Sequence, residues 1–454
     1  MMDFNSISDE VLDAMTDLLS QHLEEQLAKQ EGTKLSDIEN VMRRLLQKIG
    51  QSSLEKLLTR ADEVQPAVGC PCGGEARYVA RREAKLITVF GKVTYRRAYH
   101  LCPTCCKGSA PLDQRLLLEP GQVSRGLAPL LGLLGIGEAF DKAQTKAQHL
   151  LLLEISDNTI RKATRQLGET QALREEEWQE QSKSLAYLKG VERRQKPHPR
   201  RLYGSLDGVL VPIGPEWREM KVGSWYEVEA LPRRQWPSRY KQRLGHLEAL
   251  KATNIGYFCS LEKADAFSEL VWTTGCQRQA DLAEEIVFIA DGAQWIWRLV
   301  ADNFPKAVQI LDWYHALEYL TPIAHALFPE GKQREAWLEE MTAHLWFSRT
   351  QYVIDTCLAL LDHCSAGEVA QDAATYYTNN IYRMDYVHWR DQGYIIGSGT
   401  VESGCKQIAT ARLKCAGARW SKKGALLVAK ARAAWLGDGW NALVARYQGL
   451  PLAA

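Results

Sequence analysis

The chain has 454 residues, of which 46% are hydrophobic and 24% charged, and its 56 Lys and Arg balance its 55 Asp and Glu to a net charge of +1. These proportions exclude a disordered or collagen-like chain, and the length predicts about three domains of ~150 residues each. The charge is unevenly distributed, because residues 1–40 carry ten acidic and two basic side chains whereas residues 403–437 carry eight basic side chains and no acidic one. Near-neutrality therefore does not exclude a polyanionic partner.

The N-terminal region is predicted to be helical, since Ile38, Val41, Leu45 and Ile49 recur at helical spacing. Its acidic first part is typical of a solvated helical face, although a dimerisation arm or a flap that shields a basic surface would have the same composition. The N-terminal residues lack the basic segment followed by an apolar segment that is typical of an export signal. The longest uncharged apolar stretch is far shorter than the ~20 residues of a membrane-spanning helix. We therefore expect a cytoplasmic protein without a membrane partner.

Five of the eleven cysteines lie in two short turns. Cys70 and Cys72 belong to the first turn, and Cys102 and Cys105 to the second, which has the C-x2-C spacing of metal knuckles. Two such turns joined by a β-hairpin would place four thiolates around Zn²⁺, in a structural site with no open position. The first pair is one residue short of that spacing, and Cys106 competes with Cys105 for the fourth position. The segment between the turns is basic as well as rich in β-formers, which suits contact with phosphates.

A helical unit is expected after this module. Ser156 is a good N-cap for a helix at 159–167, and the polar residues 156–163 resemble the second helix of a helix-turn-helix (HTH). Plain packing helices explain the pattern equally well. The basic, proline-containing segment 193–201 that follows is predicted to be a domain boundary.

Downstream of this connector the pattern becomes α/β. The predicted strands cover 201–212, 219–228, 257–261, 286–290 and 307–311, with a helix at 264–285 and another through Trp295 and Leu299. Because the last two strands are separated by a short helical crossover, we expect them to be parallel. In such sheets chemistry gathers at the carboxyl ends of the strands, where Asp291 and Asp312 both lie.

Four acidic residues stand out, and each has a structural alternative. Asp207 in Asp207-Gly208 suits a hairpin turn, Asp291 and Asp312 suit helix N-caps, and Glu402 suits the first turn of a helix. As a set, however, they are what a two-metal site requires, in which carboxylate oxygens hold two cations ~4 Å apart for an in-line phosphoryl displacement.

From Asp207 onward the chain resembles the DDE transposases with a ribonuclease-H-like core, of the Mutator-like kind found in bacterial insertion sequences. The matching stretches are 203–209, 289–293, 312–316 and 397–403, and the cysteine segment 70–74 resembles the Kra-type members of that group. The likeness covers most of residues 65–440.

The resemblance implies the roles of the site residues. Asp207, Asp291 and Glu402 would be the first, second and third catalytic carboxylates, holding two Mg²⁺ or Mn²⁺ ions. Asp312 and His315 match the Asp/Cys-x2-His element that follows the second acid. Asp312 is the main alternative to Asp291, and His315 would lie near the scissile phosphate or brace the site.

Two basic stretches without acidic residues are predicted to contact DNA, mainly at its phosphates. Their residues are Arg233, Arg234, Arg239, Lys241 and Arg243 in a loop, and Lys406, Arg412, Lys414, Arg419, Lys422 and Lys423 after Glu402. Trp236 and Trp420 lie within these stretches and are the candidates for stacking on bases.

We therefore expect a multidomain α/β protein with a ribonuclease-H-like catalytic core. The expected domains are an N-terminal helical region at 1–63, a zinc-ribbon-like module at 64–112, a helical HTH-like unit at 113–190, the first part of the core at 191–328, an α-helical insertion at 329–392, and the rest of the core with its basic helix at 393–454. The expected function is cleavage of DNA at the inverted repeats of a mobile element and transfer of the 3′-OH end to target DNA, by a homo-oligomer on DNA. The alternatives are a catalytically silent DNA-binding protein of transposase descent and a structure-selective nuclease without strand transfer.

Overall fold

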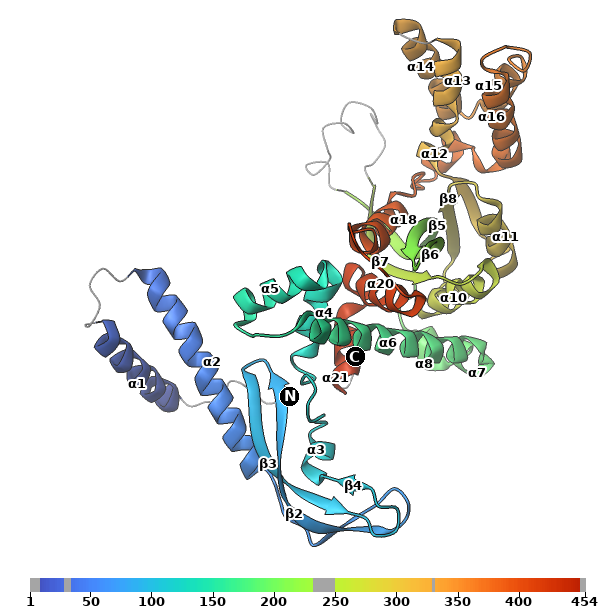
Figure 1. The fold of residues 1–454 in the computed structure, drawn as a ribbon. Coiled ribbons are helices and arrows are strands. Elements are labelled where there is room, and N and C mark those ends of the chain that lie inside the picture. Colours follow the sequence, from blue (N-terminus) through green and yellow to red (C-terminus); the bar gives the residue numbers. More distant parts are fainter. Residues whose placement is uncertain (1–8, 28–33, 232–249, 329–330, 450–454) are drawn as a thin grey trace. The chain divides into compact units, whose positions relative to one another are not determined.

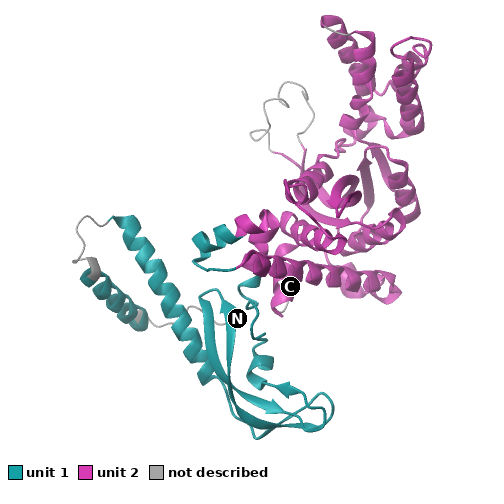
Figure 2. Cartoon of the chain, in the orientation of Figure 1, with its two compact units in different colours: residues 1–128, 144–155 teal, residues 129–143, 156–454 magenta. Residues whose placement is uncertain are grey.

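The computed structural model describes residues 9–27, 34–231, 250–328 and 331–449. The chain divides into two compact units (Figure 2), of which unit 1 comprises residues 1–128 and 144–155 and unit 2 comprises residues 129–143 and 156–454. Each unit contains its own β-sheet and its own hydrophobic core.

Unit 1 combines helices with a four-stranded antiparallel sheet of strand order β1-β2-β3-β4 (Figure 1). Its elements are α1 (Asp9–Leu27), α2 (Leu35–Arg60), β1 (Ala67–Gly69), β2 (Glu75–Thr88), β3 (Gly91–Leu101), β4 (Gly108–Ser109) and α3 (Pro111–Arg115). β2 and β3 form a long hairpin, and the Thr88 hydroxyl donates a 2.9 Å hydrogen bond to the Gly91 carbonyl oxygen at its turn. Gly91 has a φ of +102°, which residues with a side chain rarely adopt.

The C-terminal half of α2 packs on this hairpin. Leu58 is buried with apolar side chains of the hairpin and of α3, namely Ala84, Leu86, Val93, Tyr95 and Leu112. The Glu55 carboxylate accepts a hydrogen bond of 2.9 Å from the backbone N–H of Thr94. The predicted N-terminal helix is thus part of the hydrophobic core of unit 1.

Unit 2 contains a five-stranded mixed sheet of strand order β7-β6-β5-β8-β9. Its strands are β5 (Arg201–Ile213), β6 (Glu216–Ala230), β7 (Leu250–Ser260), β8 (Glu285–Ala290) and β9 (Val308–Leu311), and the connecting helices are α10 (Ala264–Gln277) and α11 (Gln294–Asn303). β5, β6 and β7 are antiparallel neighbours, whereas β8 and β9 run parallel to β5.

The five strands predicted for this region are all present. β7 begins at Leu250 rather than at residue 257, and the helix predicted at 264–285 ends already at Gln277. It ends there because the backbone N–H of Arg278 bonds back to the carbonyls of the last turn and Gln279 adopts a φ of +59°. The α/β character and the parallel strands are therefore confirmed.

Helices cover both faces of this sheet. On one face Trp225, Phe258 and Phe288 pack with apolar residues of α10, α11 and the helices that follow β9. On the other face Val222 and Cys259 pack with the segment after residue 398. That segment contains α18 (Gly399–Gly404), the π-helical turn η4 (Cys405–Thr410), α19 (Ala411–Leu413), α20 (Lys422–Leu436) and α21 (Trp440–Gln448).

The residues predicted as an HTH-like unit are helical. They form α4 (Ala128–Gly137), α5 (Phe140–Leu151) and α6 (Asp157–Lys183), followed by α7 (Leu185–Leu188) and α8 (Val191–Gln195). Ser156 caps α6 as predicted, since its hydroxyl accepts a 3.2 Å hydrogen bond from the Thr159 backbone N–H. A role of this unit in reading DNA stays a prediction.

The segment 193–201 lies within unit 2 and does not separate the two units. The reason is that α6, which precedes this segment, packs closely on α20 of the same unit. A Cβ atom at Gly168 would lie 2.1 Å from the carbonyl oxygen of Leu427, so only glycine permits this approach. In the same contact Lys430 forms a buried ion pair with Glu175.

The described chain between β9 and α18 is helical, as predicted for the insertion. Its elements are α12 (Trp313–Glu318), α13 (Leu320–Leu327), α14 (Lys332–Trp346), α15 (Thr350–Leu358), α16 (Gly367–Asn380), η3 (Ile381–Arg383) and α17 (Tyr386–Asp391). The Tyr386 hydroxyl donates to the Leu311 carbonyl oxygen at 3.2 Å and so ties α17 to the end of β9. None of the helices in the described ranges is both long and apolar enough to cross a membrane.

Candidate metal and carboxylate sites

The sulfur atoms of four cysteines meet in unit 1. Those of Cys70, Cys72, Cys102 and Cys105 all lie within 4.8 Å of one another. The Cys70–Cys105 and Cys72–Cys102 sulfur pairs are 3.6 and 3.7 Å apart. Four thiolates at ~2.3 Å from one tetrahedral ion have sulfur–sulfur distances of about 3.8 Å. The cluster therefore has the dimensions of a four-thiolate metal site.

The geometry of the two turns shows how the short first pair fits the cluster and which of Cys105 and Cys106 joins it. In the first turn Gly73 has a φ of +86°, and the Cys70 N–H donates to the Gly74 carbonyl oxygen at 2.8 Å. This tight loop lets a Cys-x-Cys pair present both sulfurs to one point. In the second turn Cys105 joins the cluster, whereas Cys106 is exposed and has a φ of +56°.

Backbone donors favour the thiolate form of one of these cysteines. Hydrogen bonds from the backbone N–H groups of Cys105 and Thr104 lower the pKa of Cys102 to about 6. The N–H of Cys72 acts likewise on Cys70, but burial and the neighbouring sulfurs raise the pKa of Cys70 to about 12. A bound cation would displace the protons of its thiol ligands.

Three aspartates lie on neighbouring parallel strands of unit 2, Asp207 within β5, and Asp291 and Asp312 directly after β8 and β9. Ser205 pairs with Ile289 on β5 and β8, and Ala290 pairs with Leu311 on β8 and β9. Continuing this register places Asp207 level with Asp291, and Asp291 level with Asp312. Because neighbouring strands are ~4.8 Å apart, the backbones of the three aspartates form a row across the sheet.

Asp207 is partly buried on β5 and faces the segment after Glu402. Burial raises its pKa, and the negative charge of Asp291 acts in the same direction. A hydrogen bond with the Cys405 thiol opposes this shift. Burial also raises the pKa of Cys405, so this thiol stays protonated and can donate. Cys405 was not predicted as a site residue, because nothing in its sequence spacing brings it to Asp207.

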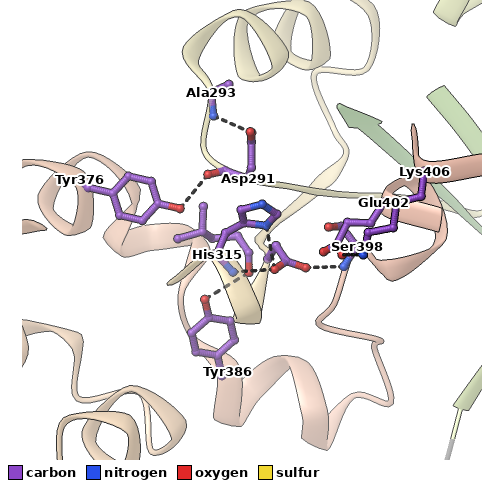
Figure 3. A network of polar contacts seen from close by, with 10 residues as sticks. Asp291, Ala293, His315, Tyr376, Tyr386, Ser398, Glu402 and Lys406 are labelled. Carbon is purple, nitrogen blue, oxygen red and sulfur yellow. Dashed lines mark hydrogen bonds and ion pairs between the residues drawn. The ribbon is translucent and has the colours of Figure 1, made fainter. Parts of the chain in front are cut away.

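The carboxylate of Asp291 points toward the start of α11 (Figure 3). Its Oδ1 atom accepts a 2.9 Å hydrogen bond from the Ala293 backbone N–H. The Asp291 carbonyl oxygen accepts a 2.7 Å hydrogen bond from the Tyr376 hydroxyl of the helical insertion. Asp291 is only half-buried, so its carboxylate lies at a surface that solvent reaches.

Asp312 is fully buried, and both of its carboxylate oxygens accept hydrogen bonds. Oδ1 accepts from the backbone N–H of His315 at 2.8 Å and contacts its Nδ1 at 3.1 Å, while Oδ2 accepts from the backbone N–H of Ser398. Asp312 is thus the N-cap of α12, and it also holds the segment that leads into α18. The Trp313 N–H supports the same junction by donating to the Ile396 carbonyl oxygen at 2.9 Å.

His315 and Glu402 lie beside Asp312. One ligand atom from each of the three residues lies within 4.8 Å of the others, so this group could hold a metal ion. The hydrogen bond with Asp312 raises the pKa of His315 to about 9. A protonated His315 therefore supplies positive charge between two carboxylates in the absence of a cation.

Glu402 occupies the first turn of α18, and the following π-helical turn begins at Cys405. Single π-helical turns of this kind frequently occur at functional sites. The Lys406 ammonium lies 3.9 Å from the Glu402 carboxylate, and its side chain is 77% exposed. The structure therefore brings Asp312, His315 and Glu402 within ligand distance, with Asp207 and Asp291 in the same row of strands.

One predicted DNA contact is wrong. Arg412 is only 2% exposed, because its guanidinium packs over the rings of Phe140 and Trp420 and its Nε donates to the Gly135 carbonyl oxygen at 2.9 Å. Trp420 is likewise occupied, since its Nε1 donates to the Leu413 carbonyl oxygen at 3.0 Å. The basic run after Glu402 thus contains an arginine that is packed in the protein core.

The other predicted DNA contacts differ in their surroundings. Lys406, Lys414, Arg419 and Lys423 are exposed and Lys422 is half-buried. Lys422 forms an ion pair with Glu262 and Lys423 with Glu169. Arg233, Arg234, Arg239, Lys241 and Arg243, with Trp236, lie outside the described residues.

The comparison with known proteins concerns mainly the N-terminal half of the chain. No curated protein matches it. Residues 28–215, less than half of the chain, match the profile of an uncharacterised protein family (UPF0236). The matched region contains all four clustered cysteines and Asp207, and it ends before Asp291 and Glu402. The chain is thus similar over these residues to a family that has no assigned function.

Proposed function

We propose that unit 2 is the catalytic part of a DDE-type transposase with a ribonuclease-H-like core. The observation that carries this proposal is that Asp207, on β5, and Asp291, directly after the adjacent parallel strand β8, lie level with each other, with Glu402 in the first turn of a helix that packs on the same face of the sheet. The strand order, with three antiparallel strands followed by two strands parallel to the first, supports the same assignment. The all-helical segment between β9 and α18 supports the Mutator-like subtype.

The residues fit a pair of hard divalent cations. Asp207, Asp291 and Glu402 are half-buried carboxylates, and carboxylate oxygens are the ligands that Mg²⁺ and Mn²⁺ prefer. Burial, and to a smaller extent the charge of Asp291, raises the pKa of Asp207, and a bound cation would oppose this shift. Two bound metal ions would stabilise the charge that develops on the attacking and leaving oxygens of a phosphodiester.

The remaining residues hold this arrangement. Asp312 uses both oxygens for hydrogen bonds and is better suited to fixing the start of α18, and hence Glu402, than to binding a metal ion. His315 balances the charge of Asp312 and can donate from its second ring nitrogen to an anionic substrate. Lys406 lies beside Glu402 on the exposed side, where the phosphates of bound DNA would pass.

We assign zinc to the four-cysteine cluster. Four thiolates at tetrahedral spacing suit Zn²⁺ and leave no position for substrate, so the ion would stabilise the fold of unit 1. Exposed basic side chains on β2 and β3, among them Arg77, Arg82 and Arg96, would make the surrounding ribbon a contact for DNA phosphates.

In this proposal the substrate is double-stranded DNA. The protein would cleave the terminal inverted repeats of a mobile element in the cytoplasm and join the freed 3′-OH ends to target DNA. Because two ends must be held together for joining, the active species would be a homo-oligomer on DNA.

The test is cleavage of a supercoiled donor plasmid that carries the inverted repeats flanking the gene, with Mg²⁺ or Mn²⁺. Asp207→Asn, Asp291→Asn and Glu402→Gln should each reduce cleavage at least ~10³-fold, since each removes a ligand of the reacting centre. Asp312→Asn should reduce it less. Retained nicking in the first three variants would refute the two-metal site. Loss in Asp312→Asn with wild-type cleavage in Asp291→Asn would make Asp312 the second acid.

A further inference from the structure

The helical insertion bonds to the backbone of the second proposed catalytic acid, Asp291, through one hydroxyl group. Tyr376 lies on α16, 85 residues after Asp291 in the chain, and its hydroxyl donates a 2.7 Å hydrogen bond to the Asp291 carbonyl oxygen (Figure 3). Burial raises the pKa of Tyr376, so the phenol stays protonated and remains a donor.

This bond completes the fixation of the Asp291 backbone. The carbonyl of the preceding residue, Ala290, accepts a 2.8 Å hydrogen bond from the Asp312 N–H. The carbonyl of Asp291 itself is held by Tyr376. The peptide planes on both sides of the Asp291 Cα atom are therefore oriented, one by the neighbouring strand and one by the insertion. Since the Cβ direction follows from the two planes, the direction of the Asp291 side chain is set as well.

The residue after Asp291, Gly292, leaves space for the Tyr376 ring because it has no side chain. Gly292 has a φ of +95°, and a Cβ atom there would lie 2.8 Å from Cε2 of Tyr376 and 3.1 Å from its hydroxyl oxygen. The Tyr376 ring also stacks on Tyr319, with centroids 3.8 Å apart and planes at 16°. The ring thus contacts both Tyr319 and the Asp291–Gly292 turn, and these contacts restrict the position of its hydroxyl.

We propose that Tyr376 is a positioning residue for the second metal-binding carboxylate, so that the helical insertion orients Asp291 rather than serving as an independent module. This inference rests on the proposed function, in which Asp291 binds a metal ion. It predicts that removing the hydroxyl weakens metal binding while leaving the reacting groups in place, as mutations of residues that orient metal ligands typically cost 10–100-fold in metal affinity.

Tyr376→Phe removes the hydroxyl and keeps the stacked ring. Tyr377→Phe is the matched control, because Tyr377 lies on the same helix and its hydroxyl also donates a 2.7 Å hydrogen bond to a backbone carbonyl, that of Ala316. Its ring is fully buried, so the control should cost at least as much thermal stability as the test variant.

The measurement is donor cleavage by full-length protein as a function of Mn²⁺ concentration. Tyr376→Phe should raise the Mn²⁺ concentration for half-maximal cleavage about tenfold, with most of the rate recovered at saturating Mn²⁺. Tyr377→Phe should keep the wild-type dependence. Unchanged dependence in Tyr376→Phe, or an equal shift in both variants, would overturn the positioning role.

A second readout needs no enzymatic activity and separates this inference from the proposed function. Amide hydrogen exchange at Gly292 and Ala293, measured without added metal, should be faster in Tyr376→Phe than in wild type and unchanged in Tyr377→Phe. If wild-type protein cleaves no DNA but exchange changes as expected, the proposed function fails and the coupling of the insertion to the turn stands. Unchanged exchange in Tyr376→Phe contradicts the coupling itself.

Discussion

The two candidate sites are assembled in opposite ways. The cysteine cluster draws its four sulfurs from two short turns joined by one hairpin, so that a single local structure places all of them. The carboxylate cluster draws its residues from β5, β8, β9 and α18, which are spread over nearly 200 residues and meet only when the sheet and the insertion have formed. The first site should therefore stabilise the fold around it, whereas the second depends on a fold that other contacts stabilise.

The largest expected effect comes from removing a cysteine ligand. Cys102→Ser deletes a fully buried sulfur, and structural zinc in small modules contributes ~10–16 kcal/mol of binding free energy. We expect loss of stoichiometric zinc in metal analysis of purified protein and loss of the thermal transition of unit 1. Cys106→Ser, which changes an exposed thiol outside the cluster, should retain both. Zinc at wild-type stoichiometry in Cys102→Ser would contradict the ligand assignment.

The aspartates at the ends of β8 and β9 should respond differently to the same change. In Asp312→Asn an NH₂ group, which donates, takes the place of one buried carboxylate oxygen, so an N–H such as that of Ser398 loses its acceptor. This loss should cost about 2–4 kcal/mol of unfolding free energy. Asp291→Asn changes a half-buried group, so its effect on stability should stay within about 0.5 kcal/mol. Denaturant unfolding of both variants checks this difference. Equal stabilities would contradict a fixing role for Asp312.

A smaller effect concerns pH. Asp312 raises the pKa of His315 from 6.5 to about 9, so this pair stabilises the folded state fully below pH 6.5 and ceases to do so as the pH rises through 9. Since the His315 side chain is 27% exposed, we expect a loss of roughly 1–2 kcal/mol across this window after allowing for solvent screening. The measurement is denaturant unfolding between pH 6 and 10 without added Mg²⁺. The difference between wild type and His315→Gln should shrink as the pH rises, and a constant difference would contradict the prediction.

The smallest effect on stability is expected for Lys406→Ala. The side chain is 77% exposed and its contact with Glu402 is 3.9 Å long, so unfolding free energy should change by less than about 0.5 kcal/mol. If Lys406 contacts a phosphate, the salt dependence of DNA binding should become shallower by about one unit in log K against log salt. Arg412→Ala is the contrasting variant, because removing a buried guanidinium should destabilise the protein. A slope equal to that of wild type in Lys406→Ala would remove this residue from the DNA contacts.

The contrast between the sites also explains what could be predicted from sequence. The strands of the α/β sheet were predictable because buried runs such as Ile286–Ala290 are short, apolar and followed by acids. The cysteine cluster was predictable because knuckle spacing is local. Whether Cys105 or Cys106 joins the cluster depended on the backbone turn, which spacing does not encode. The burial of Arg412 under α4 and the contacts of Cys405 and Tyr376 with the aspartates depend on tertiary packing between distant segments.

The sequence around Asp312 does not assign its role, because an aspartate that directly follows a strand suits both an N-cap and a metal ligand. The structure shows that it does cap α12, and that its second oxygen also holds the start of the segment before α18. The sequence suggests the N-cap, whereas the bond to Ser398 could not be predicted, because it depends on the return of residue 398 to the end of β9.

The most direct test of the central proposal is to locate Mn²⁺ in crystals of the protein by anomalous diffraction. Two peaks coordinated by carboxylate oxygens of Asp207, Asp291 and Glu402, at the ~2.0–2.2 Å typical of such bonds, are the predicted result. A single peak held by Asp312, His315 and Glu402, with the carboxylate of Asp291 still bonded to the Ala293 N–H, would contradict it.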